Sequence, residues 1–170
     1  MRKIACSAIA AVAVAGAGFA ASAADVLVPA PAGAPLLLET VADGVQIYAC
    51  EAQGQGFEWV FKAPEAILFD KQDRQIGTHF AGPTWKTADG ATVVGEVAGK
   101  ADAPAAGAIP WLLLRAKSHE GTGALSGVAF IRRAETKGGI APKAGCDAAH
   151  RGEQARIRYS ALYQFFGAAK

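Results

Sequence analysis

The sequence predicts an all-β fold, namely a single-domain antiparallel β-sandwich or partly open barrel closed by one disulfide. Short runs with period-two alternation of apolar residues recur along the chain and are separated by turn residues, a rhythm typical of sandwiches and barrels. Helical periodicity is nearly absent. Cys50 and Cys146 are the two cysteines that lie outside the N-terminal segment. Together these observations predict one β-rich domain over residues 36–170.

Residues 1–23 have the composition of a secretory signal peptide. Two basic residues precede an almost unbroken apolar run over residues 4–20, and small residues at 21–23 provide a site that a signal peptidase accepts. We expect cleavage before Ala24 and a periplasmic or secreted protein. The apolar run is too short to span a membrane comfortably, so no membrane anchor is expected after signal cleavage.

Removal of that segment changes the charge balance. The whole chain has 17 Lys and Arg against 15 Asp and Glu, and the mature chain has 15 of each. A neutral domain lacks the dense basic surface that nucleic-acid binding requires, so no nucleic-acid partner is expected. The mature chain of roughly 147 residues is long enough for one domain with its own core.

The cysteines predict a covalent cross-link. Cys6 lies in the segment to be removed, so Cys50 and Cys146 have only each other in an oxidising compartment. A disulfide between them would stabilise the fold by about 4–5 kcal/mol in the chain-entropy model. The alternative is a pair of free thiols that bind a metal or act in redox chemistry, although the chain lacks a C-x-x-C motif.

The first half of the domain is predicted to consist of short strands. Residues 24–35 are rich in proline, alanine and glycine and are expected to form an extended lead-in. Asp43-Gly44 is a strong hairpin signal between two alternating runs. The predicted strands are Leu36–Val41, Val45–Glu51, the run Phe57, Trp59 and Phe61, Ile67–Phe69 and Gln75–Phe80.

The second half continues the sheet. Asp89-Gly90 is a second hairpin signal, and Asp147–Ala155 is expected to form a turn or two of helix with Asp147 as its N-cap. The C-terminal run from Arg156 to Phe165 has the cleanest alternation in the chain. The predicted strands are Ala91–Val97, Trp111–Lys117, Val128–Arg133 and this C-terminal run, with Trp111–Lys117 apolar enough to be covered on both faces.

Two glycine-rich loops contain the candidate ligand-binding residues. His79 and Trp85 belong to the first loop, and Asp147 and His150 belong to the second. We expect both loops to contribute to one face, where His79, Asp147 and His150 provide polar contacts. Trp85 follows a proline in a turn region and is expected to provide an apolar contact at the surface.

Other interpretations of these residues remain open. His79, Asp147 and His150 would be suitable ligands for a metal ion. The simpler interpretation is that Asp147 caps a short helix and His150 bonds a nearby carbonyl group. No nucleotide-binding or catalytic motif occurs, so no cofactor is expected and no catalytic residue is assigned. His119 lies in a polar turn and is expected to be solvated, whereas Trp59 and Trp111 are predicted core residues.

Several segments together resemble a known family. They are GVQIYAC at 44–50, GPTW at 82–85, IPWLLL at 109–114 and GGIAPKAGCDAAH at 138–150. With these motifs the chain resembles an uncharacterised family of exported proteins from bacterial envelopes and fungal secretomes, known as a domain of unknown function. The resemblance extends over essentially the whole mature chain. It implies a shared fold and export, and no established activity.

Three classes of function are compatible with the sequence. The first is a binding domain for a small molecule or an envelope component. The second is a hydrolase-like enzyme that uses a His–Asp pair as general base, which needs His79 or His150 hydrogen-bonded to a carboxylate inside a cleft. The third is a structural or inhibitory envelope protein, which would show an exposed apolar patch or a bare sheet edge.

Overall fold

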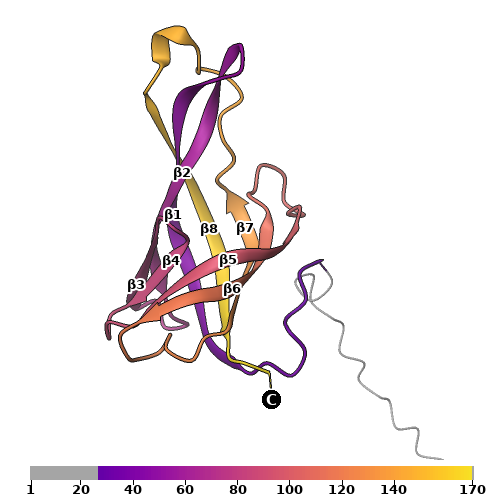
Figure 1. Cartoon of the computed structure of the whole chain (residues 1–170), viewed down its shortest axis with the longest axis vertical. Coiled ribbons are helices and arrows are strands. Elements are labelled where there is room, and N and C mark those ends of the chain that lie inside the picture. Colours follow the sequence, from indigo (N-terminus) through magenta and orange to yellow (C-terminus); the bar gives the residue numbers. More distant parts are fainter. Residues whose placement is uncertain (1–26, 170) are drawn as a thin grey trace, which may run out of the picture.

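The computed structural model describes residues 27–169 as an antiparallel β-barrel (Figure 1). Each strand pairs with the next one along the chain, and the last pairs with the first, so the sheet closes into a complete ring. The strands are β1 Leu36–Gln53, β2 Gly56–Phe69, β3 Gln75–Phe80, β4 Thr84–Thr87, β5 Thr92–Ala101, β6 Trp111–Glu120, β7 Phe130–Gly138 and β8 Gln154–Phe166. The all-β prediction is confirmed, and the structure is the barrel rather than the sandwich. The predicted signal peptide lies outside the described residues.

One predicted turn is wrong. Asp43-Gly44 lies inside β1, where Asp43 pairs with Ile67 of β2 on one side and with Ser160 of β8 on the other. A Cβ at Gly44 would overlap Ala66, so the glycine allows β1 and β2 to approach closely. Continuous pairing with two neighbouring strands therefore outweighs the local hairpin preference of the dipeptide.

Other local predictions agree with the structure. Asp89-Gly90 forms the turn between β4 and β5, and Gly90 has a φ of 92°, a conformation that favours glycine. The predicted helical turn is the 3₁₀ helix η1, Ala148–His150, and Asp147 is its N-cap. In the turn and in the 3₁₀ helix, an aspartate side chain accepts a hydrogen bond from a backbone N–H two residues later. Asp89 accepts from Ala91 N, and Asp147 accepts from Ala149 N.

The β1–β2 hairpin projects beyond the barrel (Figure 1). β2 pairs with β3 only over residues 66–69, so its earlier half leaves the ring together with β1. We call residues 50–60 and the loop 140–153 that lies beside them the extension. The predicted disulfide is confirmed: Cys50 and Cys146 join the two parts of the extension, with their Cα atoms 5.3 Å apart.

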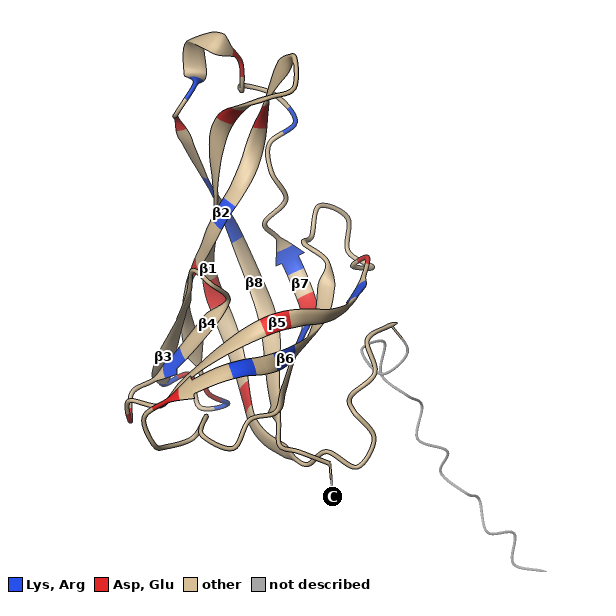
Figure 2. Ribbon diagram, viewed as in Figure 1, with Lys and Arg blue, Asp and Glu red and all other residues tan. Residues whose placement is uncertain are grey.

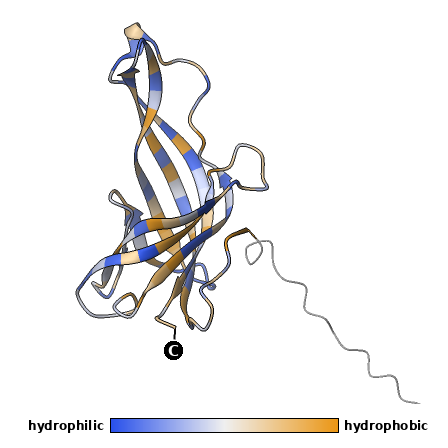
Figure 3. Ribbon diagram, turned by 45° about the vertical axis from the view of Figure 1, so that its right-hand side comes forward, coloured by the Kyte–Doolittle hydropathy of each residue, from blue (hydrophilic) through white to orange (hydrophobic). Residues whose placement is uncertain are grey.

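The main core lies inside the barrel, where apolar and polar residues alternate along the strands (Figure 3). Its largest fully buried side chains include Trp85, Tyr163, Phe165, Leu68 and Leu114. A smaller cluster of Val28, Trp111 and Ala134 covers part of the outside of the barrel. The strand Trp111–Lys117 was expected to be covered on both faces, and over its first residues it is. Trp111 is buried on the outside of the barrel and Leu114 is buried on the inside.

Charged residues of both signs are interspersed over the barrel and the extension (Figure 2). Most ion pairs are exposed, such as Arg156–Glu65 and Arg158–Asp43. Exposed pairs of this kind contribute little to stability, so the fold depends mainly on its core and on the ring of backbone hydrogen bonds. Within residues 27–169, no helix is long and apolar enough to cross a membrane.

Candidate functional site

A cavity of about 590 Å³ opens into the interior of the barrel. We call it the barrel cavity. Six of the eight strands contribute to its wall, because alternate residues of each strand point inward. Its apolar lining includes Phe61, Pro64, Pro83, Val97, Ile109, Pro110, Leu112 and Leu114, and its polar lining consists of Gln46, Tyr48, Lys62, His79, Lys100 and Arg133.

Three buried polar side chains form a cluster at the wall of this cavity: Tyr159 contacts Gln46 and Tyr163, and Tyr163 also contacts Arg133. Within residues 27–169, Gln46 Nε2 and the two tyrosine hydroxyl groups have no hydrogen-bond partner of good geometry, and the same is true of Thr40 Oγ1, Trp85 Nε1 and Trp111 Nε1. Gln46 is 3% exposed, Tyr159 2% and Tyr163 1%. A buried polar group without a partner is unfavourable by about 1–3 kcal/mol, and such groups are rare in native proteins unless a ligand or water satisfies them. Gln46, Tyr159 and Tyr163 thus place incompletely satisfied polar groups together next to Arg133 in the cavity wall.

His79 is a neutral side chain in the cavity wall. Its Nδ1 lies 2.9 Å from the carbonyl oxygen of Thr84, which can only accept, so Nδ1 carries the proton and Nε2 is the acceptor. The ring stacks on Trp85 with the ring centroids 4.3 Å apart. Burial lowers the pKa of His79 to about 3, and the positive charge of Arg133 adds to this effect. The imidazole is therefore uncharged at neutral pH.

Arg133 brings a positive charge to the same wall. Its Nε and Nη2 donate to the carbonyl oxygen of Pro110 at 3.0 and 2.8 Å. No carboxylate pairs with Arg133 in the described part of the chain. Burial raises the pKa of Tyr48 and of Tyr163, and the Arg133 charge opposes that shift in both residues.

The four predicted ligand residues fall into two separate pairs. His79 and Trp85 lie together inside the barrel, and Trp85 is 1% exposed, so its predicted place at the surface is wrong. It is buried because β4 turns its side chain inward, where it packs against Tyr163 and Phe165. The His79–Trp85 pair therefore belongs to the barrel, at the wall of the cavity.

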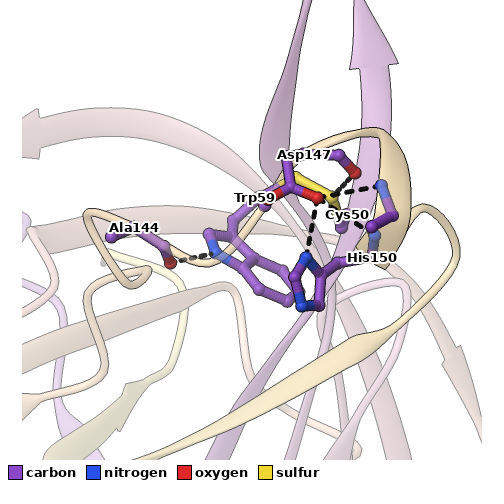
Figure 4. Close-up of polar contacts among 7 residues, drawn as sticks. Cys50, Trp59, Ala144, Asp147 and His150 are labelled. Atoms are coloured by element: carbon purple, nitrogen blue, oxygen red, sulfur yellow. Dashed lines mark hydrogen bonds and ion pairs between the residues drawn. A yellow bond between two sulfur atoms is a disulfide. The ribbon is translucent and has the colours of Figure 1, made fainter.

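Asp147 and His150 lie in the extension, beside the disulfide (Figure 4). His150 Nδ1 lies 2.7 Å from Asp147 Oδ1, and both side chains are exposed. This hydrogen bond lowers the pKa of Asp147 and raises the pKa of His150. His150 thus bonds a carboxylate rather than the expected carbonyl. The described residues contain no group of three or more side chains suited to hold a metal ion, and the three suggested metal ligands are divided between barrel and extension.

Two further predictions concern isolated residues. Trp59 is not a core residue: it lies in the extension, where its indole Nε1 donates to the carbonyl oxygen of Ala144 at 3.0 Å (Figure 4). His119 is exposed, as expected, and its Nε2 lies 2.7 Å from the carbonyl oxygen of Val128. Neither residue contacts the barrel cavity.

A larger and more open groove of about 670 Å³ runs along the start of β1 and the turn that follows β2. Its charged side chains already have partners. Asp70 pairs with Arg74, Glu39 pairs with Lys71, and Asp89 accepts from Thr87. Among the described residues the groove therefore offers no unpaired charge to a ligand, and the barrel cavity is the better candidate site.

Sequence reasoning missed Gln46, Arg133, Tyr159 and Tyr163. A usable signal existed, because period-two alternation places Tyr159 and Tyr163 on one face of the C-terminal strand and Gln46 on the same face as Tyr48. What the sequence did not reveal is that this face points into the barrel. Arg133 gave no signal of its own, since one arginine at the end of a predicted strand is normally solvated.

The chain was compared with known proteins. No curated protein and no solved structure matches it. One family matches, described as "Protein of unknown function (DUF3455)", over residues 31–75 and 71–167. These residues include all eight strands and the whole lining of the barrel cavity. On this match the chain belongs to the DUF3455 family of proteins of unknown function.

Proposed function

We propose that the protein binds a small, largely apolar molecule in the barrel cavity. One observation carries the proposal: a mainly apolar cavity has in its wall a buried polar cluster of Gln46, Tyr159, Tyr163 and Arg133, whose amide and hydroxyl groups lack well-formed hydrogen bonds among the described residues. The volume of about 590 Å³ is in the usual range of small-molecule sites. Such sites combine mainly apolar walls with a few polar groups that orient the ligand, which is the composition of this lining.

The geometry supports binding better than catalysis by a His–Asp pair. His79 faces the cavity, but its partner is a backbone carbonyl rather than a carboxylate. His150 has a carboxylate partner, but both side chains are exposed and neither lines the barrel cavity or the open groove. General-base catalysis needs both features at one place, so the binding class is preferred.

We also propose that the protein works outside the cytoplasm. A disulfide is consistent with an extracellular location, and the sequence predicts a signal peptide over residues 1–23. N-terminal sequencing of the protein from the periplasm or the medium should begin at Ala24. Recovery of the uncleaved chain from the cytoplasm would contradict export.

Fluorescence titration with 1-aminoanthracene, a neutral dye that brightens in apolar surroundings, tests the binding proposal. We expect saturable binding by the wild-type protein. Val97→Trp places a large ring in the cavity lining and should abolish this binding. Val41→Trp is the matched control, because Val41 is also exposed on a strand but does not line the barrel cavity. Equal binding by both variants would contradict the proposed site.

A further inference from the structure

Among the described residues, the charged side chains that line the barrel cavity are all cationic. They are Lys62, Lys100 and Arg133. Lys62 pairs with Glu51, which lies outside the lining. The positive charge at the cavity is therefore incompletely balanced, although the mature chain as a whole is neutral. A site of this kind attracts an anionic ligand.

Arg133 is the cation set deepest in this lining. It is half-buried, whereas Lys62 and Lys100 are exposed. Its partners among the described residues are neutral, namely the Pro110 carbonyl and the Tyr163 hydroxyl, and neutral partners satisfy donors but do not balance the charge. Charged groups that leave water are normally paired, and a planar guanidinium pairs best with a carboxylate or a phosphate. In the described residues that anion is absent, so the natural partner is a group on the ligand.

The buried polar cluster next to Arg133 supports the same chemistry. Gln46 Nε2 can only donate a hydrogen bond, and the Tyr159 and Tyr163 hydroxyl groups can donate as well. A carboxylate accepts up to about four hydrogen bonds on its two oxygens. His79 is neutral and adds no positive charge, so Arg133 determines the sign of the group that binds here.

We propose that the ligand is an apolar carboxylic acid whose carboxylate pairs with Arg133 and accepts a hydrogen bond from Gln46, while its hydrocarbon part occupies the apolar cavity. This assignment rests on the proposed binding function and adds the chemical class of the ligand. The cavity wall suits the hydrocarbon part, with Leu112, Leu114 and Ile109 among its apolar residues.

Displacement of bound 1-aminoanthracene by dodecanoate and by dodecan-1-ol, which share a chain and differ in the head group, tests this assignment. We expect dodecanoate to bind the wild-type protein at least about tenfold more tightly than the alcohol, because a charge-assisted hydrogen bond replaces a neutral one. Arg133→Gln should remove this preference, because it weakens dodecanoate binding much more than alcohol binding. Arg133→Lys should retain part of it, since the charge remains but the planar donor pair is lost.

Arg115→Gln is the matched control. It removes the same charge from an exposed residue of the neighbouring strand β6 that does not line the cavity, so the acid preference should persist. Equal affinity for acid and alcohol in the wild-type protein would overturn the carboxylate assignment and leave the binding function standing. Failure of the dye and both competitors to bind would overturn both proposals.

Discussion

Gln46 and Gln164 show at the residue scale how a binding site differs from a structural contact. Both are glutamines on strands of the barrel. Gln164 accepts from Arg132 Nε and donates to Glu39, whereas Gln46 contacts Tyr159 but its buried Nε2 has no well-formed hydrogen bond among the described residues. The Gln164 amide is therefore hydrogen-bonded through both its oxygen and its nitrogen, whereas the Gln46 amide is buried in an energetically unfavourable state. A polar residue kept in this state is typical of functional sites.

We predict opposite effects on stability when these two glutamines are replaced by leucine. Gln46→Leu should raise the free energy of unfolding of the ligand-free protein by about 1 kcal/mol, because it removes an unsatisfied buried donor. Gln164→Leu should lower that free energy by about 1–2 kcal/mol, because it breaks two hydrogen bonds. Urea unfolding of both variants measures the difference. A destabilised Gln46→Leu protein would show that the amide has a structural partner.

His79 should make the fold sensitive to mild acid. Its pKa is about 3 in the folded protein and about 6.5 when unfolded, so the unfolded chain binds more protons between these values. The free energy of unfolding should therefore fall as the pH drops below 6.5, by up to about 1.4 kcal/mol per pH unit. Urea unfolding between pH 4.5 and 6.5 measures this slope.

Two variants test whether His79 causes this pH dependence of the free energy of unfolding. His79→Phe keeps an aromatic ring against Trp85 and removes the titrating group, so it should flatten the pH dependence in this range. His119→Gln, which changes an exposed histidine, is the matched control. A wild-type protein whose stability is constant from pH 6.5 to 4.5 would contradict the buried, neutral state of His79.

Some residues of the candidate site can be predicted from the sequence and others cannot. A histidine in a glycine- and proline-rich segment suggests a loop site, and His79 does line the cavity, although it lies on strand β3. Trp85 lies within the same segment but is a core residue. Gln46 and Arg133 could not be recognised, because their importance depends on which partners are missing around them, and a sequence does not reveal missing partners.

At the scale of elements, the extension is the part of the fold that depends on covalent closure. The Cys50–Cys146 bond ties the β1–β2 hairpin to the loop before β8. Few other contacts join the same two parts: the Trp59–Ala144 hydrogen bond and backbone bonds from Cys50 to Glu153 and Gly152 are among them. The extension therefore has no large core of its own.

Replacement of both cysteines by serine should lower the free energy of unfolding by about 2–5 kcal/mol. The barrel cavity lies outside the extension, so the double variant should still bind 1-aminoanthracene when folded. Urea unfolding and dye titration of the same sample measure both effects. Trp59→Phe serves as a control that removes one hydrogen bond of the extension and keeps the disulfide. Loss of dye binding in the folded double variant would show that the extension is part of the site.

Turns and helix caps were predicted correctly from local sequence where neighbouring residues alone determine the structure. Asp147 caps η1 and Asp89-Gly90 turns the chain, because each aspartate satisfies backbone N–H groups close by. Asp43-Gly44 has the same composition and failed, because β1 pairs with β2 and β8 over its length. Pairing with residues more than a hundred positions away is not visible in the dipeptide itself.

At the scale of the whole molecule, closure of the sheet creates the site. Alternation predicts strands, but ring closure depends on the pairing of β1 with β8, which are far apart in the sequence. Closure brings the inward residues of six strands around one space. Core residues such as Phe165 and Leu68 fill part of the interior, and the remaining part is the barrel cavity. The fold class could therefore be predicted from sequence, whereas the cavity could not.

The indole N–H signals of the three tryptophans in a ¹H–¹⁵N NMR spectrum can show where the ligand binds. Trp85 stacks on His79 at the cavity wall, Trp59 lies in the extension, and Trp111 is buried outside the barrel. On titration with 1-aminoanthracene, we expect a saturable shift of the Trp85 signal while the Trp59 and Trp111 signals stay in place. A shift confined to Trp59 or Trp111, or no shift at all, would contradict ligand binding in the barrel cavity.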